Sequence, residues 1–281
     1  MKQVVSNLYS QTVNLMSDLL TLHNVEVTGN GTQSVILLHG FGCNRSMWRH
    51  LRPRLEQQYR VVRFDHMGTN PQSVASYHAE AYSDLRTYAR DLIAICRELD
   101  LEKPIFIGHS VSATLGILAA GMEPGLFKML VLIGPSPRYL NDEDYTGGFE
   151  RADLDELMEA LESNYLGWSG AIAPAIMGNA DRPRLGEELT DSFCRMNPEV
   201  AANFARATFY SDNREDLKKV TVPTLVLQTR EDIIAPPVVG EYVHRNIADS
   251  EYVLLDATGH LPHLSAPEAT NRAILDFLKT P

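Results

Sequence analysis

The sequence predicts an α/β fold, in which a mainly parallel β-sheet carries helices on both faces. Short runs rich in Val, Ile and Leu recur along the chain and alternate with segments of helical length. Strands that are apolar at nearly every position are typical of parallel sheets buried on both faces. One interval, residues 136–213, breaks the alternation because it shows helical periodicity and no strand. We therefore expect one α/β core with an all-helical insertion.

The core is predicted to consist of residues 25–135 and 214–281, with residues 1–24 forming an N-terminal arm or helix. The predicted strands are Val35–Leu38, Val61–Phe64, Pro104–Ile107, Met129–Ile133, Thr224–Leu227 and Tyr252–Leu255. The predicted helices are Asp84–Leu99, Ala113–Gly121, Pro237–Ile247 and Pro267–Leu278. In such sheets the functional site lies at the carboxyl ends of the strands.

The insertion is expected to fold as four helices that form a lid over this end of the sheet. Two apolar helical faces are visible: Leu154, Leu157, Met158 and Leu161, then Leu185, Leu189, Phe193 and Met196. Another helix should begin at Asn197–Pro198, because Asn is a frequent N-cap and Pro a frequent first helical residue. Gly167–Met177 is the fourth candidate. The alternative is a helical bundle away from the site.

Charge and cysteine spacing indicate which kind of ligand and which cellular compartment to expect. The formal net charge of −11 disfavours nucleic-acid and anionic-membrane surfaces, which leaves a neutral or apolar small molecule as the expected ligand. The three cysteines, Cys43, Cys96 and Cys194, are too widely spaced for a disulfide framework or a zinc site. No signal peptide or transmembrane run is evident, so we expect a cytoplasmic protein.

A nucleophile is predicted at Ser110. Gly108-His109-Ser110-Val111-Ser112 follows the strand Pro104–Ile107 directly and precedes a helix. A serine on such a tight strand-to-helix turn projects its hydroxyl above the sheet, which is the nucleophile elbow of α/β hydrolases. The usual final glycine of this motif is Ser112 here. The position of the motif between a strand and a helix predicts the α/β-hydrolase fold.

The serine needs a base and an acid, which follow it in that fold in the order Ser, acid, His. Asp232 follows the strand Thr224–Leu227, and His260 follows Tyr252–Leu255. We expect Asp232 to orient His260, and His260 to take the serine proton. Glu231 and Asp256 are alternatives for the acid, and His263 is the alternative for the base.

Two backbone amides are expected to form the oxyanion hole, those of Val111 after the nucleophile and of Phe41 in His39-Gly40-Phe41-Gly42. A plain tight turn is the other interpretation of the second motif. Apolar side chains should line the pocket; the candidates are Phe41, Ile133, Trp168, Ile172, Ile176, Phe193, Met196, Phe209 and Ile234. No phosphate loop, dinucleotide motif or metal-ligand cluster is present in the sequence, so no cofactor or metal is expected.

Taken together, five motifs resemble one family. They are Gly-His-Ser-Val-Ser-Ala at 108–113, His-Gly-Phe-Gly-Cys at 39–43, Gly-Pro-Ser-Pro-Arg-Tyr-Leu-Asn at 134–141, Tyr-Leu-Gly-Trp at 165–168 and Asp-Ile-Ile-Ala-Pro at 232–236. From about Asn24 to the C-terminus the chain resembles the RsbQ-like hydrolases of the bacterial stress response and the related plant strigolactone and karrikin receptors. The segment before about Leu20 and the loop Asp65–Asn70 depart from the bacterial pattern.

The resemblance implies a V-shaped four-helix lid over an apolar pocket, with Ser110, Asp232 and His260 as the triad and Phe41 and Val111 as oxyanion donors. Its bacterial branch implies action upstream of a PAS-containing PP2C-type phosphatase, and its plant branch implies slow butenolide hydrolysis coupled to partner binding. Two functions are therefore expected. One is hydrolysis of a small apolar ester or lactone, and the other is ligand sensing in which hydrolysis is slow or vestigial.

Overall fold

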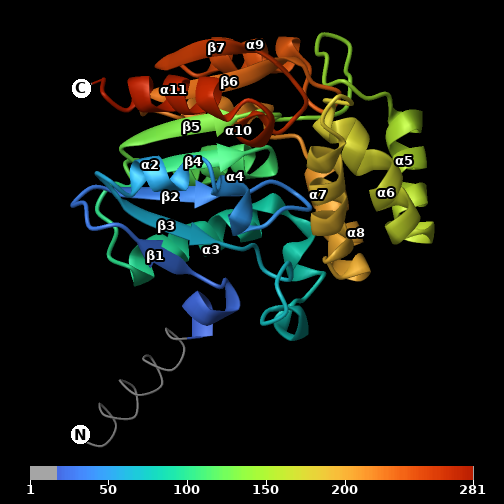
Figure 1. The fold of residues 1–281 in the computed structure, drawn as a ribbon, viewed down its shortest axis with the longest axis horizontal. Helices are drawn as coiled ribbons and strands as arrows, with labels where there is room; N and C mark the ends of the chain where they lie inside the picture. The colour runs from blue at the N-terminus through green and yellow to red at the C-terminus, as the bar shows by residue number, and fades with distance from the viewer. Residues whose placement is uncertain (1–17, 281) are drawn as a thin grey trace, which may run out of the picture.

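A seven-stranded sheet is the centre of the computed structural model, which describes residues 18–280 (Figure 1). The strand order is β1-β3-β2-β4-β5-β6-β7, and only β1 runs antiparallel to its neighbour. The strands are β1 Glu26–Thr28, β2 Ser34–Leu38, β3 Arg60–Phe64, β4 Ile105–His109, β5 Met129–Ile133, β6 Thr224–Glu231 and β7 Ser250–Thr258. This confirms the predicted fold class. The three-residue β1 is too short to show a pattern in the sequence.

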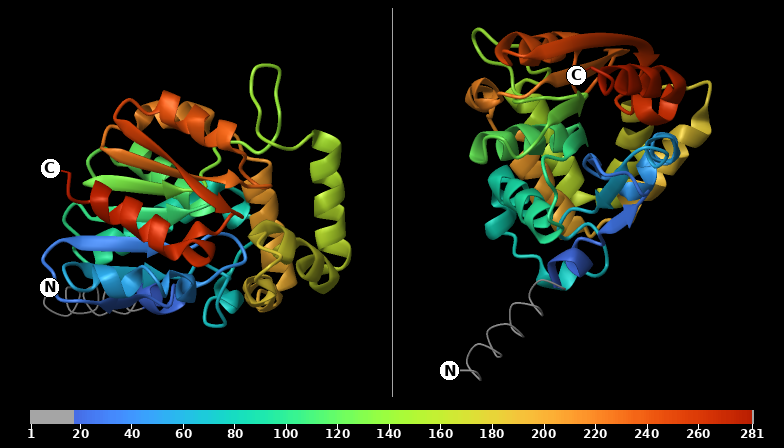
Figure 2. Two further views of the ribbon diagram at one scale, coloured as in Figure 1. Left: turned by 45° about the horizontal axis from the view of Figure 1, so that its top comes forward. Right: turned by 90° about the vertical axis from the view of Figure 1, so that its left-hand side faces the viewer.

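Helices cover both faces of the sheet, as the two views in Figure 2 show. They are α2 Arg52–Leu55, α3 Leu85–Glu98, α4 Val111–Met122, α9 Pro237–Asn246, α10 Pro262–Ser265 and α11 Pro267–Phe277. Short 3₁₀ turns connect them: η1 Arg45–Trp48, η2 Val74–Ser76, η3 Ala81–Ser83 and η4 Arg214–Lys219. Successive side chains of a strand point to opposite faces, so Ile36 and Leu38 pack with α3 and α4 while Val35 and Leu37 pack with α2 and α11. This two-sided burial explains the unbroken apolar strands.

The insertion between β5 and β6 forms four helices at the carboxyl ends of the strands (Figure 1). They are α5 Arg151–Ser163, α6 Tyr165–Met177, α7 Pro183–Cys194 and α8 Pro198–Phe209. The Asn164 side chain caps α6 by accepting the N–H of Gly167, and Asn197 caps α8 through the N–H groups of Glu199 and Val200. The predicted helical lid is therefore present, with α6 beginning two residues before the expected Gly167.

The N-terminal arm predicted for residues 1–24 falls largely outside the described residues. Within the described part, residues 18–22 are helical. None of the helices in residues 18–280 combines the length and apolar character that a bilayer-spanning segment requires.

Candidate active site

Ser110 occupies the sharp turn between β4 and α4. Its backbone has φ 57° and ψ −124°, a conformation that is strained for any residue with a side chain. The N–H of Ser110 donates to the carbonyl of Ile133 at 2.8 Å, so the end of the neighbouring strand β5 holds the turn in place. This hydrogen bond to the sheet stabilises the strained turn. The turn places the serine at the carboxyl edge of the sheet, beneath the lid.

His260 joins Ser110 and Asp232 in one hydrogen-bonded chain. Its Nε2 lies 2.7 Å from Ser110 Oγ and its Nδ1 lies 2.7 Å from Asp232 Oδ2. A carboxylate only accepts, so Nδ1 carries the proton and Nε2 is free to accept the serine hydroxyl. All three side chains are almost entirely buried. This is the arrangement in which an imidazole can remove a serine proton.

Backbone donors stabilise the charge on Asp232. Its Oδ1 accepts the N–H groups of Ile234 at 2.8 Å and Ala235 at 3.0 Å. Burial raises the pKa of the Asp232 carboxyl, but the adjacent His260 and these two N–H bonds outweigh it, so the pKa lies below its ordinary value. The acid is therefore ionised throughout the neutral range and can hold the imidazole in one tautomer.

The alternative acids and base lie elsewhere. Glu231 is exposed at the end of β6 and accepts the hydroxyl of Thr258 at 2.8 Å. Asp256 is an exposed partner of Arg230. His263 is buried in α10 and stacks on Trp48, with ring centroids 4.8 Å apart. Of the candidate acids and bases, Asp232 and His260 are the pair that the structure connects to Ser110.

The loop after β2 approaches the elbow closely at Gly40. A side-chain carbon at this position would lie 2.6 Å from Nδ1 of His109 and 3.1 Å from Cβ of Ser110, so only glycine fits. Phe41, the next residue, lines the cavity over Ser110. Val111 is the first residue of α4, where the backbone N–H has no partner within the helix. Both expected oxyanion donors are thus in the segments that flank the nucleophile.

A buried hydrogen-bond network lies behind the elbow, and the sequence did not predict it. The Ser112 hydroxyl donates to the carbonyl of His39, and His66 Nε2 lies 2.9 Å from that carbonyl and 3.0 Å from Ser112 Oγ. Ser112, which replaces the usual glycine, thereby ties the elbow to the loop carrying Phe41. The only sequence signal was a hydroxyl at a position where glycine is typical.

Asp65 extends this network to the end of β3. It lies 3.4 Å from His39 Nε2 and accepts the side-chain amide of Asn24 at 2.8 Å and the N–H of Arg45 at 3.1 Å. Burial raises the pKa of the Asp65 carboxyl, yet these donors together lower it to about 2. The loop before Phe41 is therefore held by a carboxylate that is ionised at neutral pH.

The cavity above Ser110 is small and mainly apolar, with a volume of about 30 Å³. Four predicted pocket residues line it together with Phe41: Ile176, Phe193, Phe209 and Ile234. Its other lining residues are Cys43, His109, Leu189 and Leu261, next to Ser110 and His260. A volume of this size holds about one water molecule. A larger substrate must therefore displace some of these lining side chains to reach the serine.

The other predicted pocket residues do not line the small cavity above Ser110. Ile133 is fully buried in the core on the α2 and α11 side, because strand alternation turns it away from the lid. Trp168 stacks on Phe193, with ring centroids 5.8 Å apart, one layer behind the cavity. Met196 is buried and Ile172 half-buried in the helix packing of the lid. Helical periodicity identifies apolar faces, but it does not say whether a face meets a cavity or another helix.

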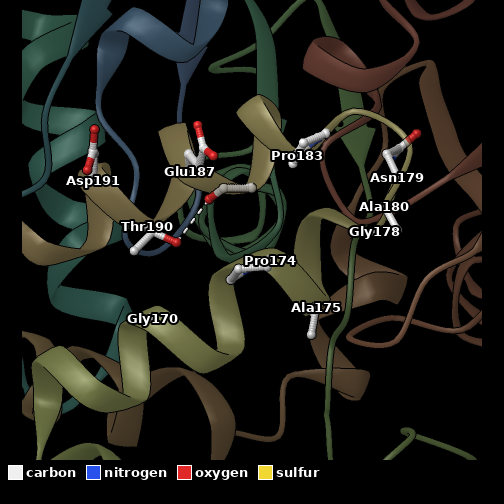
Figure 3. A pocket seen from close by; sticks show the side chains of 11 residues that line it. Gly170, Pro174, Ala175, Gly178, Asn179, Ala180, Pro183, Glu187, Thr190 and Asp191 are labelled. Atoms are coloured by element: carbon white, nitrogen blue, oxygen red, sulfur yellow. Dashed lines mark hydrogen bonds between the residues drawn. The ribbon is translucent and has the colours of Figure 1, made fainter.

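A larger groove of about 650 Å³ lies between α6 and α7, away from the triad. Figure 3 shows that its lining includes the small residues Gly170, Pro174 and Ala175. The carboxylates of Glu187 and Asp191 also line it. Its lining includes no serine–histidine pair, so the chemistry belongs to the smaller cavity. Among the described residues, no cluster of His, Cys, Asp and Glu is arranged to hold a metal ion.

Comparisons with known proteins agree with this geometry. Residues 35–273 match the model of the Alpha/beta hydrolase family. The chain is 44% identical over 259 residues to a probable esterase of Oryza sativa subsp. japonica, covering 92% of this chain and 96% of that protein. It is 42% identical over 254 residues to a karrikin insensitive 2 receptor of Petunia hybrida, covering 90% and 94%.

Two further matches bear on the chemistry and the fold. A strigolactone esterase of Arabidopsis thaliana is 39% identical, with 89% of this chain and 94% of that protein covered. The structure of a hydrolase from Oleispira antarctica superposes with a TM-score of 0.91 at 38% identity, covering 95% of this chain and 98% of the other. The chain belongs to the alpha/beta hydrolase family, and it is a serine hydrolase closely related to these plant receptors and esterases.

Proposed function

We propose that this protein hydrolyses a small apolar ester or lactone through an acyl-enzyme on Ser110. The observation that carries the proposal is the continuous chain from Ser110 Oγ through His260 to the ionised Asp232, beneath a cavity lined mainly by apolar side chains. A mainly apolar site disfavours charged substrates, because a charge loses part of its hydration there without a partner.

The first half-reaction forms the acyl-enzyme. Ser110 Oγ attacks the carbonyl carbon while His260 Nε2 removes the hydroxyl proton, and the charge that develops on the carbonyl oxygen is stabilised by the N–H groups of Val111 and Phe41. When the tetrahedral intermediate collapses, the carbon–oxygen bond to the leaving alcohol breaks, and His260 returns the proton to that oxygen. With a lactone the alcohol stays attached to the acyl chain.

The second half-reaction restores the serine. A water molecule gives a proton to His260 and attacks the acyl carbon, and the proton then passes to Ser110 Oγ as the acid is released. Throughout, Asp232 stabilises the imidazolium without taking the proton. The segment 136–213 acts as the lid, and residues 25–135 with 214–281 supply the chemistry.

We place this hydrolysis in a signalling context of the RsbQ-like kind, with a PAS-containing PP2C-type phosphatase as partner. The alternative is a ligand sensor whose hydrolysis is slow or vestigial. Relatives named both as receptors and as esterases support a link between ligand and signal. The cavity supports it physically, since four of its lining residues, Ile176, Leu189, Phe193 and Phe209, belong to the lid, so a ligand bound there contacts the lid directly.

Active-site labelling tests the chemistry. A fluorophosphonate should modify the wild-type protein and not Ser110→Ala. Cleavage of short p-nitrophenyl esters should begin with a burst of one p-nitrophenol released per chain, as each Ser110 is acylated. Mass spectrometry that finds no adduct on the folded wild-type protein contradicts the proposal. If S110A retains a ligand-induced shift in Tm and partner binding, the sensing role does not need the chemistry.

A further inference from the structure

We propose that His109 is a positioning residue for the base: its ring N–H holds the main chain of His260 and so sets the distance between His260 Nε2 and Ser110 Oγ. The proposal rests on the proposed function, because it assigns a role within that reaction. His109 is the last residue of β4 and directly precedes the nucleophile.

The contact has one chemical interpretation. His109 Nε2 lies 2.8 Å from the carbonyl oxygen of His260, and both residues are buried. A carbonyl only accepts, so Nε2 carries the hydrogen and donates it. The other nitrogen, Nδ1, has no hydrogen-bond partner among residues 18–280 and lies beside Gly40, where a side-chain carbon would come within 2.6 Å of it. The ring is therefore held in one tautomer and one orientation.

His109 stays neutral at physiological pH. Burial lowers its pKa well below the ordinary value, and the neighbouring His263, His260 and His39 lower it further, while the bond to the His260 carbonyl acts in the opposite direction. The ring also packs edge-on against His263, with centroids 4.7 Å apart, and His263 stacks on Trp48. This packing prevents the ring from turning its N–H away from the carbonyl.

Several hydrogen bonds hold the backbone around His260. The N–H of His260 donates to the carbonyl of Ile176 in α6 at 2.9 Å, and the N–H of Gly259 donates to the carbonyl of Glu231 at 2.7 Å. The Thr229 hydroxyl donates to the carbonyl of Gly259 at 3.0 Å, and the carbonyl of His260 accepts from the side chain of His109. The residue adjacent to the nucleophile thus holds the base, although 150 positions separate nucleophile and base in the chain.

The competing interpretation is that His109 only fills a buried space. The pair His109→Leu and His109→Gln separates the two roles, because Leu retains volume without a donor whereas Gln carries an amide N–H at similar reach. If His109 positions the base, H109L should lower kcat for a short p-nitrophenyl ester about 10- to 100-fold, since small displacements of catalytic groups have effects of this size. KM should change less than about threefold, and H109Q should recover most of the lost kcat.

Thermal unfolding of the same variants completes the test. The proposal is overturned if H109L retains kcat within about twofold of wild type, or if H109Q has the same Tm as wild type but a kcat as low as that of H109L. Should H109L not fold, H109N against H109Q replaces it, because the shorter Asn amide does not reach the carbonyl. A wild-type protein that neither cleaves esters nor reacts with fluorophosphonate refutes the proposed function itself, whereas an active H109L refutes only the role of His109.

Discussion

The carbonyl of Ile176, at the end of lid helix α6, accepts the backbone N–H of His260 at 2.9 Å. The catalytic base is therefore bonded directly to the lid. Asn179 strengthens the same junction, because its side-chain amide donates to the carbonyls of Met177 and Thr258, each at 2.8 Å. Movement of the lid is thus mechanically linked to the loop that carries the base.

Asn179→Ala should destabilise the fold and slow the reaction together. Two carbonyls lose their donor, which costs about 1–3 kcal/mol of unfolding free energy, and alanine fits poorly at the observed φ of 57°. We expect a lower Tm and a reduced kcat. The matched control is Asn164→Ala at the other end of α6. Loss of this helix cap should lower the unfolding free energy by about 1 kcal/mol and leave kcat near wild type. Equal losses of kcat in both variants would argue against the linkage.

Asp232→Asn should nearly abolish turnover while leaving the protein folded. The amide can present an N–H to His260 Nδ1, which favours the tautomer with its proton on Nε2 and leaves Ser110 without an acceptor. In serine proteases this change lowers kcat about 10⁴-fold, and we expect a loss of similar order here. Steady-state ester hydrolysis measures it, with circular dichroism as the check on folding. Turnover within about tenfold of wild type would exclude Asp232 as the orienting acid.

Asp65 should make stability depend on pH. Its pKa is lowered from 3.8 to about 2 in the folded protein, so the ionised carboxylate stabilises the fold above the unfolded-state value, and this contribution is lost as the pH falls from about 4 toward 2. A shift of this size corresponds to about 2 kcal/mol. Asp65→Asn should therefore lower the unfolding free energy at pH 7 and reduce its loss on acidification. Urea unfolding at pH 7 and pH 3 measures both, and parallel losses in wild type and D65N would contradict the assignment.

Phe193→Ala should widen the range of substrates. Phe193 lines the cavity, and its ring also packs on Phe41 with centroids 5.7 Å apart. Removing the ring opens space above Ser110, so kcat/KM should rise for bulkier acyl chains relative to acetate esters. The cost is about 3–5 kcal/mol of stability from the cavity created. A series of p-nitrophenyl esters of increasing acyl length checks this, and an unchanged chain-length preference would place the substrate elsewhere.

The residues of the reaction could be inferred from the sequence because local rules apply to each. A serine two residues after a glycine, between a strand and a helix, indicates an elbow, and an acid and a histidine after later strands complete the order of the fold. The central strands themselves are apolar at nearly every position, as burial on two faces demands. Ser112 and His109 carry no comparable signal, since their partners, the carbonyls of His39 and His260, are backbone atoms of distant segments.

The sequence by itself determined the fold class, the helical insertion and which side chains have the chemistry for nucleophile, base and acid. The tertiary structure decided that Phe193 faces a cavity while Trp168 lies behind it. It also decided that the backbone N–H of His260 bonds to the lid and its carbonyl to His109 beside the nucleophile. The reason is physical: periodicity reports which face of an element is apolar, whereas its neighbours depend on how separate elements pack. Backbone carbonyls occur at every residue, so only their approach in space shows which side chain holds which one.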